Sequence, residues 1–411
     1  MKVCVIGGGA AGMMCATMIA RKGHSVSLYE KNEKLGKKIY ITGKGRCNVT
    51  NATVGDDFLK NVVNGRKFVM GAITRFNSND TKAFFEDLGV TLKIERGNRV
   101  FPASDKSSDI IKAMEKAMRW AGVDVHLCTP VLKVLETDGV VSGIETEKGK
   151  LDFDAVVVAT GGVSYPSTGS TGDGYEFAKS VGHTIVQPKP ALCAVILKSN
   201  ELVELQGLSL KNVKLISKCG DKTVYESEIG EMLFTHNGIS GPIVLSTSSM
   251  INKFNMSDLK LYIDFKPALS VDSLLNRIDR DIVDLKAKQV SSLLEGFLPK
   301  SLVKIFAARL GVKTDFKANQ LDKEKRKKLA NLLKNFEMVP KSLENFDCAI
   351  VTSGGITLKE INPKYMKSKL VQGLYFIGEV LDIDAMTGGF NLQLAFSTAV
   401  TCSSDFKDLR S

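Results

Sequence analysis

Residues 3–12 read Val3-Cys4-Val5-Ile6-Gly7-Gly8-Gly9-Ala10-Ala11-Gly12, a short apolar run that leads directly into the spacing Gly7-x-Gly9-x-x-Gly12. In a strand–turn–helix unit, the first glycine permits the tight turn and the second lets the backbone approach a pyrophosphate. The third glycine lets the helix pack closely, with its N-terminal N–H groups facing the phosphates. The stretch therefore predicts a dinucleotide site rather than a plain glycine-rich turn.

The residues that follow support the same prediction. An amphipathic helix is expected over about 10–22, and Val26-Ser27-Leu28-Tyr29 supplies a second strand that ends at Glu30. Glu30 lies eighteen residues after Gly12, where an acid can accept hydrogen bonds from a ribose diol. A strand before the glycines, a helix after them and a terminal acid make the motif specific.

Length and composition indicate an ordinary globular protein. The chain has 411 residues, 44% hydrophobic and 25% charged, enough for two or three domains. No run approaches 18 consecutive apolar residues, so no membrane span is expected. The first strand begins at Lys2, which leaves no room for a signal peptide, and we expect a cytoplasmic protein.

The eight cysteines do not form a recognisable site. They stand at positions 4, 15, 47, 128, 193, 219, 348 and 402, and no two have the spacing of a zinc knuckle or a redox dithiol. We expect reduced thiols, no metal site and no dithiol reductase mechanism.

The net charge of +11 raises the question of an anionic partner. One basic run, residues 322–328, falls on an expected helix and is interpreted as a solvated face. Few aromatic residues accompany the basic ones, and the chain has a single tryptophan, which argues against stacking on RNA bases. We therefore expect a small-molecule substrate rather than nucleic acid.

The pattern along the chain changes twice. Helices are expected at 79–88 and at 107–121, the second capped by Ser107 or Ser108, and a buried parallel strand at 154–158. From about 188, short β-like runs suggest a barrel or sandwich, at 191–197, 212–218, 223–227, 242–246 and 259–265. Residues 271–335 are expected to be helical. From Phe346 onward, the pattern of short strands and glycine-rich turns that lead into helices returns. This predicts a discontinuous nucleotide-binding domain (1–187 and 346–411) with a β-barrel-like insert (188–270 and 336–345) and a helical insert (271–335).

Two further glycine-rich segments are candidate site elements. Residues 36–48 follow the ribose-binding strand and combine Lys and Arg with glycines, a suitable lining for a pyrophosphate or a flavin edge. Residues 160–174 begin with Thr160-Gly161-Gly162, where a buried strand ends. Asp173 is expected to cap the next helix, and the phenol of Tyr165 is a candidate proton donor.

The C-terminal segment supplies a second half-site. A short strand ends at Gly378-Glu379, and Gly388-Gly389 leads into a helix from Asn391. An acid at a strand end can hold a polyol, and a helix N-terminus can stabilise charge on a ring carbonyl. Two half-sites fit FAD, which spans an ADP half and a flavin half. NAD fits less well, because this segment has no GxGxxG of its own.

These strings resemble a bacterial FAD-binding flavoprotein family that includes aminoacetone oxidase and proteins assigned as bile-acid dehydrogenases or reductases. The matching segments span nearly the whole chain, at 5–12, 43–51, 99–102, 160–174, 235–242, 351–355 and 373–399. The resemblance implies an α/β fold with a glutathione-reductase-type Rossmann-like FAD domain, interrupted by a β-barrel and a helical subdomain.

No His or Cys stands in an obvious attachment context, so we expect FAD to be bound non-covalently. The FAD contacts that the resemblance implies are Gly7, Gly9, Ala10, Ala11, Gly12, Glu30, Lys31, Lys38, Thr42, Arg46, Cys47, Asn48, Val131, Thr160, Gly161, Gly378, Glu379, Gly389, Phe390, Asn391 and Leu392. Met386 stands where the family more often has proline, which leaves the local turn geometry open.

The predicted activity is that of an FAD-dependent oxidoreductase. The leading hypothesis is reduction of C=C or C=O in a small or steroid-like molecule, with NAD(P)H as a transient co-substrate. Alternatives are an amine oxidase that uses dioxygen, and a flavin-containing RNA-binding or RNA-modifying protein. His236, on the insert, joins Tyr165 as a candidate acid or base. The sequence leaves substrate and oligomeric state open.

Overall fold

The computed structural model describes residues 1–285 and 288–410, which form two compact units. Unit 1 comprises Met1–Pro190 and Phe346–Ser411, and unit 2 comprises Ala191–Asn345. The expected domain edge at 187 lies inside one strand, β12 (Ile185–Ala191). Within the described residues, none of the helices combines the length and apolar character that a membrane crossing requires.

A seven-stranded sheet organises unit 1, as the α/β prediction requires. Its order is β22 (Ile361–Asn362), β23 (Lys367–Ser368), β24 (Leu374–Phe376), β11 (Ala155–Val158), β1 (Lys2–Ile6), β2 (Ser25–Tyr29) and β7 (Asp124–His126). The strands from β24 to β7 are parallel, and β1 pairs with β11 on one side and β2 on the other. The strand order therefore runs in opposite senses on the two sides of β1. In sheets of this kind, ligands bind at such a switch point.

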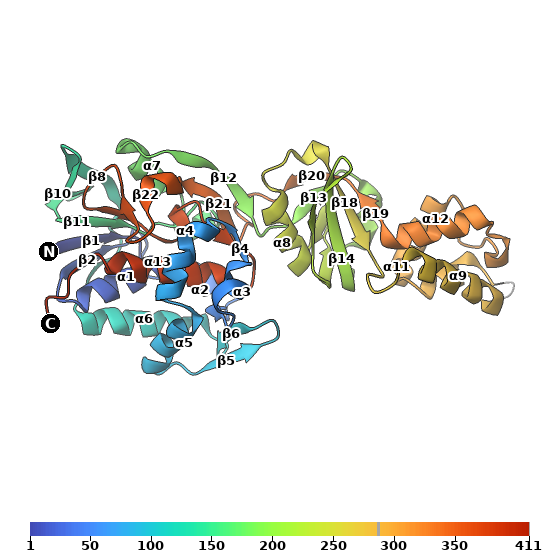
Figure 1. Ribbon diagram of the computed structural model, residues 1–411, viewed down its shortest axis with the longest axis horizontal. Helices are drawn as coiled ribbons and strands as arrows, with labels where there is room; N and C mark the ends of the chain where they lie inside the picture. Colours follow the sequence, from blue (N-terminus) through green and yellow to red (C-terminus); the bar gives the residue numbers. More distant parts are fainter. Residues whose placement is uncertain (286–287, 411) are drawn as a thin grey trace. The chain divides into compact units, whose positions relative to one another are not determined.

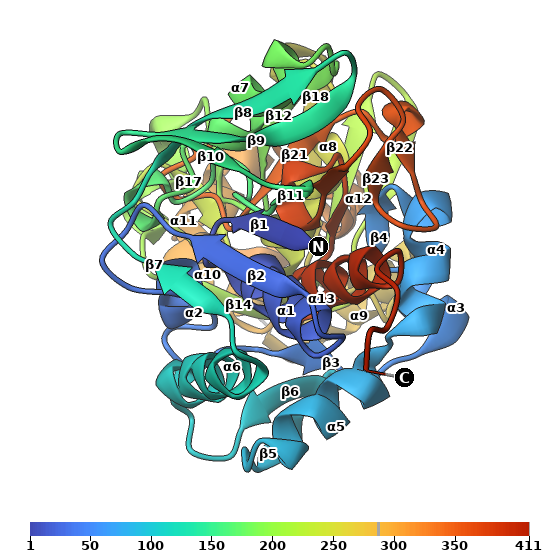
Figure 2. The same cartoon turned by 90° about the vertical axis from the view of Figure 1, so that its left-hand side faces the viewer.

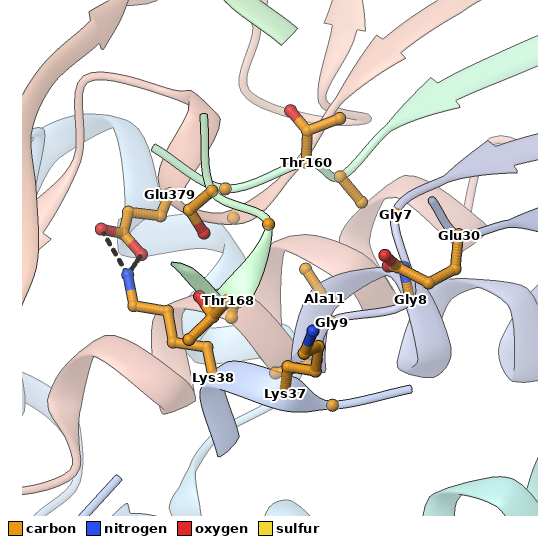
Figure 3. Close-up of a pocket in the computed structure, with 18 of the residues that line it drawn as sticks. Gly7, Gly8, Gly9, Ala11, Glu30, Lys37, Lys38, Thr160, Thr168 and Glu379 are labelled. Carbon is orange, nitrogen blue, oxygen red and sulfur yellow. Dashed lines mark hydrogen bonds and ion pairs between the residues drawn. The ribbon is translucent and has the colours of Figure 1, made fainter. Parts of the chain in front are cut away.

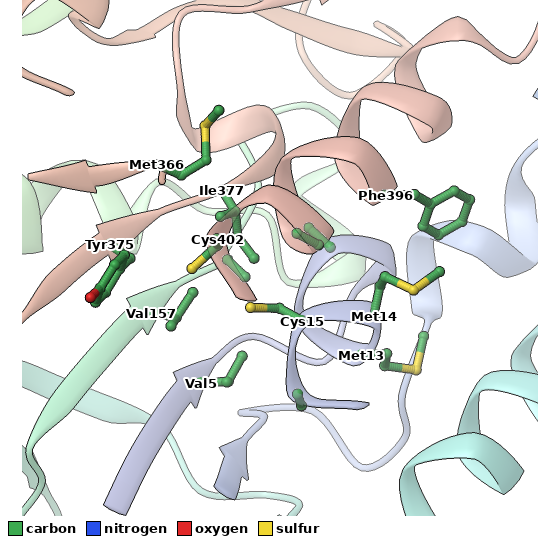
Figure 4. Close-up of a cluster of buried hydrophobic side chains, with 14 of the residues drawn as sticks. Val5, Met13, Met14, Cys15, Val157, Met366, Tyr375, Ile377, Phe396 and Cys402 are labelled. Atoms are coloured by element: carbon green, nitrogen blue, oxygen red, sulfur yellow. The ribbon is translucent and has the colours of Figure 1, made fainter. Parts of the chain in front are cut away.

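Helices cover one face of this sheet (Figure 2). Helix α1 (Ala10–Ala20) packs against α13 (Phe390–Ser403) and α6 (Ser107–Ala121). The other face carries an antiparallel sheet of β8 (Val131–Thr137), β9 (Val140–Thr146) and β10 (Gly149–Asp152). The core between β1 and the helices α1 and α13 is fully buried. Cys15 of α1 and Cys402 of α13 are in contact there (Figure 4). Residues from both ends of the chain thus share one core.

Smaller elements complete unit 1. The helices are α2 (Lys37–Ile41), α3 (Gly55–Leu59), α4 (Arg66–Arg75), α5 (Ser78–Asp87) and α7 (Asp173–Ser180). The strands are β3 (Thr50–Asn51), β4 (Val62–Asn64), β5 (Leu92–Glu95), β6 (Arg99–Pro102), β12, β21 (Val351–Ile356) and β25 (Asp384–Ala385). Two one-turn helices, η1 (Pro166–Thr168) and η6 (Gly378–Val380), follow β11 and β24.

Unit 2 joins an eight-stranded sheet to a helical part (Figure 1). The strand path is β19 (Phe336–Met338), β18 (Leu259–Asp264), β14 (Ser209–Cys219), β16 (Gly230–Phe234), β17 (Gly238–Ser240), β13 (Val195–Leu197) and β20 (Pro340–Leu343), with β15 (Lys222–Glu226) paired to β14. The helices are α8 (Pro242–Ile251), α9 (Val271–Leu285), α10 (Val290–Glu295), α11 (Lys300–Leu310) and α12 (Lys323–Lys334).

Two local predictions were wrong. The expected strand at 242–246 is the first turn of α8, in which Pro242 occupies a position where its missing N–H is harmless. The β-branched pair Ile243-Val244 had suggested a strand. Helix α6 has the predicted bounds and ends at Gly122, but neither Ser107 nor Ser108 caps it. Ser107 instead donates its hydroxyl to the carbonyl of Tyr40 at 3.1 Å.

Candidate functional site: an elongated cavity in unit 1

An elongated cavity runs along the carboxyl ends of the central strands (Figure 3). It encloses about 1340 Å³, its open mouth included, and all its lining residues belong to unit 1. The walls come from the β1–α1 turn, the end of β2, helix α2, the segment after β11, and η6 with the start of α13. The segments predicted from sequence therefore converge on one space.

The three glycines of the β1–α1 turn have three different surroundings. A Cβ on Gly7, where φ is +107°, would lie 2.6 Å from the Ala159 carbonyl oxygen. A Cβ on Gly12 would lie 1.9 Å from the Gly7 oxygen, so α1 can approach β1 only without a side chain there. Gly9 has no atom within 4 Å of its Cβ position and lines the cavity. Backbone here is open to a ligand, at a helix N-terminus that favours phosphate.

Glu30 is buried at the end of β2, as the motif predicts, and is held by its neighbours. Its Oε2 accepts the Gly8 N–H at 2.7 Å, and its Oε1 accepts from the backbone and side-chain nitrogens of Asn32 at 2.8 and 2.6 Å. A carboxylate offers about four acceptor positions, so capacity remains for a ribose hydroxyl. Asn32 was not predicted, because its role depends on the turn that brings it back to Glu30.

Lys31 forms an ion pair across the cavity wall. Its Nζ lies 2.6 Å from the Asp173 carboxylate and donates to Thr171 at 2.5 Å. The predicted capping role of Asp173 is wrong, because Gly172 is the N-cap of α7 and Asp173 is its first residue. Lys31 and Asp173 both line the cavity.

A second ion pair joins the two ends of the chain. Lys38 on α2 donates to Glu379 at 2.8 Å and to Ser164 at 2.6 Å, and Figure 3 shows the Lys38–Glu379 contact at the cavity wall. Glu379 also accepts the backbone N–H of Thr352 at 2.7 Å. This network ties helix α2 to β21 and η6 beside the cavity.

The loop after α2 is only partly at the cavity. Thr42 lines it, but Arg46, Cys47 and Asn48 do not. The Arg46 guanidinium is paired with Glu95 and Asp105 and lies 4.3 Å from the centre of the Phe101 ring. Burial raises the pKa of the Cys47 thiol to about 12, so this thiol stays protonated at neutral pH.

Only some of the predicted residues of the C-terminal half-site line the cavity. Gly378, Glu379, Asn391 and Leu392 line the cavity, while Gly389 and Phe390 pack behind it. A Cβ on Gly389 would meet the Thr50 carbonyl at 2.4 Å, and the Phe390 ring lies 5.0 Å from that of Phe58.

Asn391 fastens the turn before α13. Its amide donates to the Ala385 carbonyl at 2.8 Å and accepts the Ala385 N–H at 2.9 Å. The side chain thus holds β25 against the start of α13, so that the helix N-terminus remains beside the cavity.

The other predicted residues divide as follows. Ala10, Ala11, Val131, Thr160 and Gly161 line the cavity, and Gly12 does not. The Thr160 hydroxyl is a buried polar atom without a hydrogen-bond partner among the described residues. Gly8, Lys37, Thr168, Gly169 and Ser170 also line the cavity and lie in segments that the sequence indicated. Lining residues outside those segments and outside the predicted contacts include Tyr29, Asn32, Thr129, Phe177, Ile350, Val351, Ile383, Leu394 and Ala395.

Neither predicted acid–base residue lines the cavity. Tyr165 is half-buried before η1 in a left-handed conformation, φ +52°, and burial raises the pKa of its phenol above its usual value. His236 is exposed in the turn between β16 and β17 of unit 2. A non-glycine residue with positive φ is uncommon and marks a conformation fixed by its surroundings.

These observations fit a two-part nucleotide such as FAD. Gly9 leaves open space at a helix N-terminus, Glu30 keeps acceptor capacity, and the Thr160 hydroxyl lacks a partner. The cavity is long enough to reach from the ribose-binding acid to the start of α13.

Comparison with known proteins agrees with this geometry. The family described as the HI0933-like protein Rossmann domain matches residues 1–405. The chain is 31% identical over 404 residues to the ribosomal RNA dihydrouridine synthase of Haemophilus influenzae, covering 97% of this chain and 96% of that one. It is 29% identical over 408 residues to the 3-dehydro-bile acid delta(4,6)-reductase of Clostridium scindens, covering 97% of each.

A solved structure shares the fold. The 3-ketosteroid delta1-dehydrogenase of Sterolibacterium denitrificans superimposes with a TM-score of 0.51 at 13% identity, over 98% of both chains. At this identity the likeness concerns the fold alone.

Proposed function

The chain belongs to the HI0933-like family and is an FAD-dependent oxidoreductase, and from this premise we propose that it reduces a carbon–carbon double bond conjugated to a carbonyl group. The predicted family, fold class, enzyme class and cofactor are thereby confirmed. The reaction, substrate and residue roles below are proposals.

The observation that carries the proposal is that two relatives match from end to end and have different substrates with the same reactive group. One relative makes dihydrouridine, which is uridine saturated at the ring double bond next to a carbonyl. The other reduces a 3-oxo bile acid with double bonds at positions 4 and 6, in conjugation with the ketone. Reduction adds a hydride to the carbon remote from the carbonyl and a proton to the carbon beside it.

Reduced FAD supplies the hydride in such chemistry, and the protein positions it. The electrons come from NAD(P)H, which we propose binds transiently because the chain has no second dinucleotide motif. We propose that the N-terminus of α1 holds the pyrophosphate, Glu30 the ribose, and the start of α13 the flavin end. Lys38 and Glu379 would fix the wall between these parts.

We propose a uridine in ribosomal RNA as the substrate. The support is the match to an RNA-modifying relative over nearly all of both chains, together with the net charge of +11, which attracts a polyanion. This reverses the order in which the sequence alone had placed the two substrate classes. A steroid-like enone is the second candidate, supported by the similarity to the bile-acid reductase.

The test is anaerobic reoxidation of the reduced holoenzyme. NADPH or NADH first bleaches the flavin band, and unmodified ribosomal RNA or a 4-en-3-one steroid is then added. Recovery of the band with RNA, and dihydrouridine in its nuclease digest by mass spectrometry, are expected. Recovery with the steroid alone would identify the second candidate. Bleaching by aminoacetone, with peroxide release on aeration, would overturn both in favour of an oxidase.

Proton donation is tested separately. Tyr165 and His236 remain the proposed donors, and each is replaced by a residue that cannot donate, Tyr165→Phe or His236→Asn. The true donor's loss should slow flavin reoxidation by substrate and remove one limb of its pH profile, while NAD(P)H still bleaches the flavin normally.

A further inference from the structure

A group of exposed cations lies beside helix α2, whose inner side lines the cavity. We define it as the basic rim, which consists of Lys34, Lys44, Arg96, Arg99 and Lys106. All five are exposed, and none forms an ion pair with another described residue. They come from three segments far apart in sequence: the α2 region, the β5–β6 hairpin and the start of α6.

Backbone and side-chain contacts hold these segments together. The Ser107 N–H donates to the Gly45 carbonyl at 2.9 Å, which places Lys106 beside the loop that carries Lys44. Arg46 pairs with Glu95 of the hairpin and with Asp105 before α6. The hairpin also pairs with β3, where Thr50 is opposite Val100. The three segments that carry the rim are therefore held against one another.

Acids on the same surface are already neutralised. Glu95 and Asp105 are bound by Arg46, and Lys93 lies 2.6 Å from Asp105. Asp109, which accepts from Ser104 at 2.6 Å, is the one acid in segments 34–48 and 92–109 without a cation partner. Five free cations against one acid leave a positive field directed at solvent.

Apolar side chains are exposed among these cations. Tyr40 is 37% exposed and Ile41 is 44% exposed. The Lys34 ammonium lies 5.0 Å from the centre of the Tyr40 ring. On the same short helix, Lys38 and Ile39 line the cavity. Proteins that bind single-stranded RNA stack its bases on aromatic and aliphatic side chains and contact its phosphates with cations.

The loop conformation adds an independent observation. Gly43, Lys44 and Gly45 have φ values of +61°, +58° and +84° in succession. A lysine in the left-handed region is strained where glycine would not be. The loop keeps a long cation at this position all the same, and its side chain is exposed rather than packed.

We propose that the basic rim, with Tyr40 and Ile41, binds the single-stranded RNA that flanks the reacting uridine. Lysine and arginine contact phosphates, and Tyr40 and Ile41 support an adjacent base. This inference rests on the proposed function, because it names the surface that receives the RNA substrate.

The test measures binding of the holoenzyme to a fluorescent single-stranded uridine oligonucleotide at several salt concentrations. The rim variant is Lys44→Gln/Arg96→Gln/Lys106→Gln. The slope of log K against log salt is negative, and each lost phosphate contact makes it less steep by about 0.7. The slope of the triple variant should therefore be less steep by about 2 units, and its affinity at 0.1 M salt should fall about a hundredfold. Tyr40→Ala should weaken binding about tenfold, and Tyr40→Phe should not.

The matched control is Lys112→Gln/Lys148→Gln/Lys150→Gln, which removes the same charge at exposed sites of the same unit. It should bind within about twofold of the wild type. Flavin absorbance of every variant reports whether unit 1 is folded. Equal losses in rim and control variants, or wild-type binding by the rim variant, would overturn the inference. So would binding of phosphatidylglycerol vesicles in place of RNA.

The two proposals can fail separately. If the wild type forms dihydrouridine in RNA but the rim variant binds RNA as well as the wild type does, the inference is wrong and the function stands. If RNA binds through the rim and no dihydrouridine forms, the surface stands and the proposed reaction is wrong.

Discussion

Helix α12 and the basic rim are two basic regions of the chain, and they differ in what surrounds their charges. On helix α12 in unit 2, Lys325 pairs with Asp322 at 2.5 Å and Arg326 with Asp279 at 3.0 Å. The buried side of that helix packs Leu329 and Leu333 into an apolar core. The basic rim in unit 1 instead leaves five cations unpaired beside exposed apolar side chains and a cavity. Helix α12 also carries three exposed cations without an ion pair in the described chain, Lys323, Lys327 and Lys328. The rim differs because its cations come from three separate segments and lie beside exposed apolar side chains and a cavity.

The largest effect is expected from a substitution that disrupts the cavity beside the rim. In Gly12→Val, a Cβ would meet the Gly7 oxygen at 1.9 Å, so α1 must move away from β1. We expect loss of bound FAD and a fall in the free energy of unfolding of about 3 kcal/mol or more. Flavin absorbance and denaturant unfolding measure both effects.

Gly71→Ala is the control for that substitution. Gly71 lies in α4 with no atom within 4 Å of its Cβ position. It should keep its flavin and gain up to about 1 kcal/mol. An unchanged flavin content in Gly12→Val would show that the β1–α1 turn does not hold the cofactor.

The Asp384 carboxyl gives a pH dependence specific to unit 1. Its pKa is raised from 3.8 to about 6, mainly by burial, while Asn64 and Ser353 hydrogen-bond to it. The folded state therefore binds more protons than the unfolded state between these values. Stability from this group falls as pH rises from about 4 to 6, by about 3 kcal/mol in total.

Asp384→Asn should abolish that fall, and the exposed Asp152→Asn should not. The measurement is the free energy of unfolding at pH 4, 5, 6 and 7 for the three proteins. Parallel curves for wild type and Asp384→Asn would show that Asp384 is ionised with an ordinary pKa.

Neighbouring lysines on α2 sharpen the comparison at smaller scale. Lys38→Met leaves the partly buried Glu379 without its cation and should destabilise unit 1 by about 1–2 kcal/mol and weaken FAD binding. Lys37→Met removes an ion pair with Glu33, whose side chain is 62% exposed, and a 3.2 Å hydrogen bond to Asn32, and should change stability by less than about 1 kcal/mol. A double-mutant cycle with Glu379→Gln isolates the first pair; equal effects of the two single changes would show that Lys38 is an ordinary surface residue.

The smallest effect is expected on α12. Lys323→Gln/Lys327→Gln/Lys328→Gln removes three exposed cations that have no ion pair in the described chain. RNA affinity should change by less than about twofold and stability by less than about 0.5 kcal/mol. A hundredfold loss of RNA binding in this variant would invert the comparison and move the RNA surface to unit 2.

The sequence predicted those parts of the site that depend on local chemistry. The β1–α1 turn and the end of β2 could be located because a tight turn, a close helix–strand approach and a strand end each demand one residue type, at Gly7, Gly12 and Glu30. The cofactor contacts of these residues stay predictions. The Asp138-Gly139 dipeptide is a typical hairpin turn, and it joins β8 to β9 with both of its residues at positive φ.

What the sequence could not supply is pairing across long separations. Lys38 and Glu379 are 341 residues apart, and only the sheet brings them together. Arg46 was expected near the cofactor. Its binding to Glu95 in the hairpin and to Asp105 before α6 could not be foreseen from the sequence. The helix at 242–251 was hidden because its apolar run is compatible with either structure until its packing is known.

The interrupted course of unit 1 has a consequence for its biosynthesis. Strand β24 and helix α13 are made after unit 2, yet β24 pairs with β11 and α13 packs on α1. A nascent chain released at residue 345 would already contain all of unit 2, but only part of the sheet and one end of the cavity. Acquisition of the cofactor therefore has to wait until α13 has been translated.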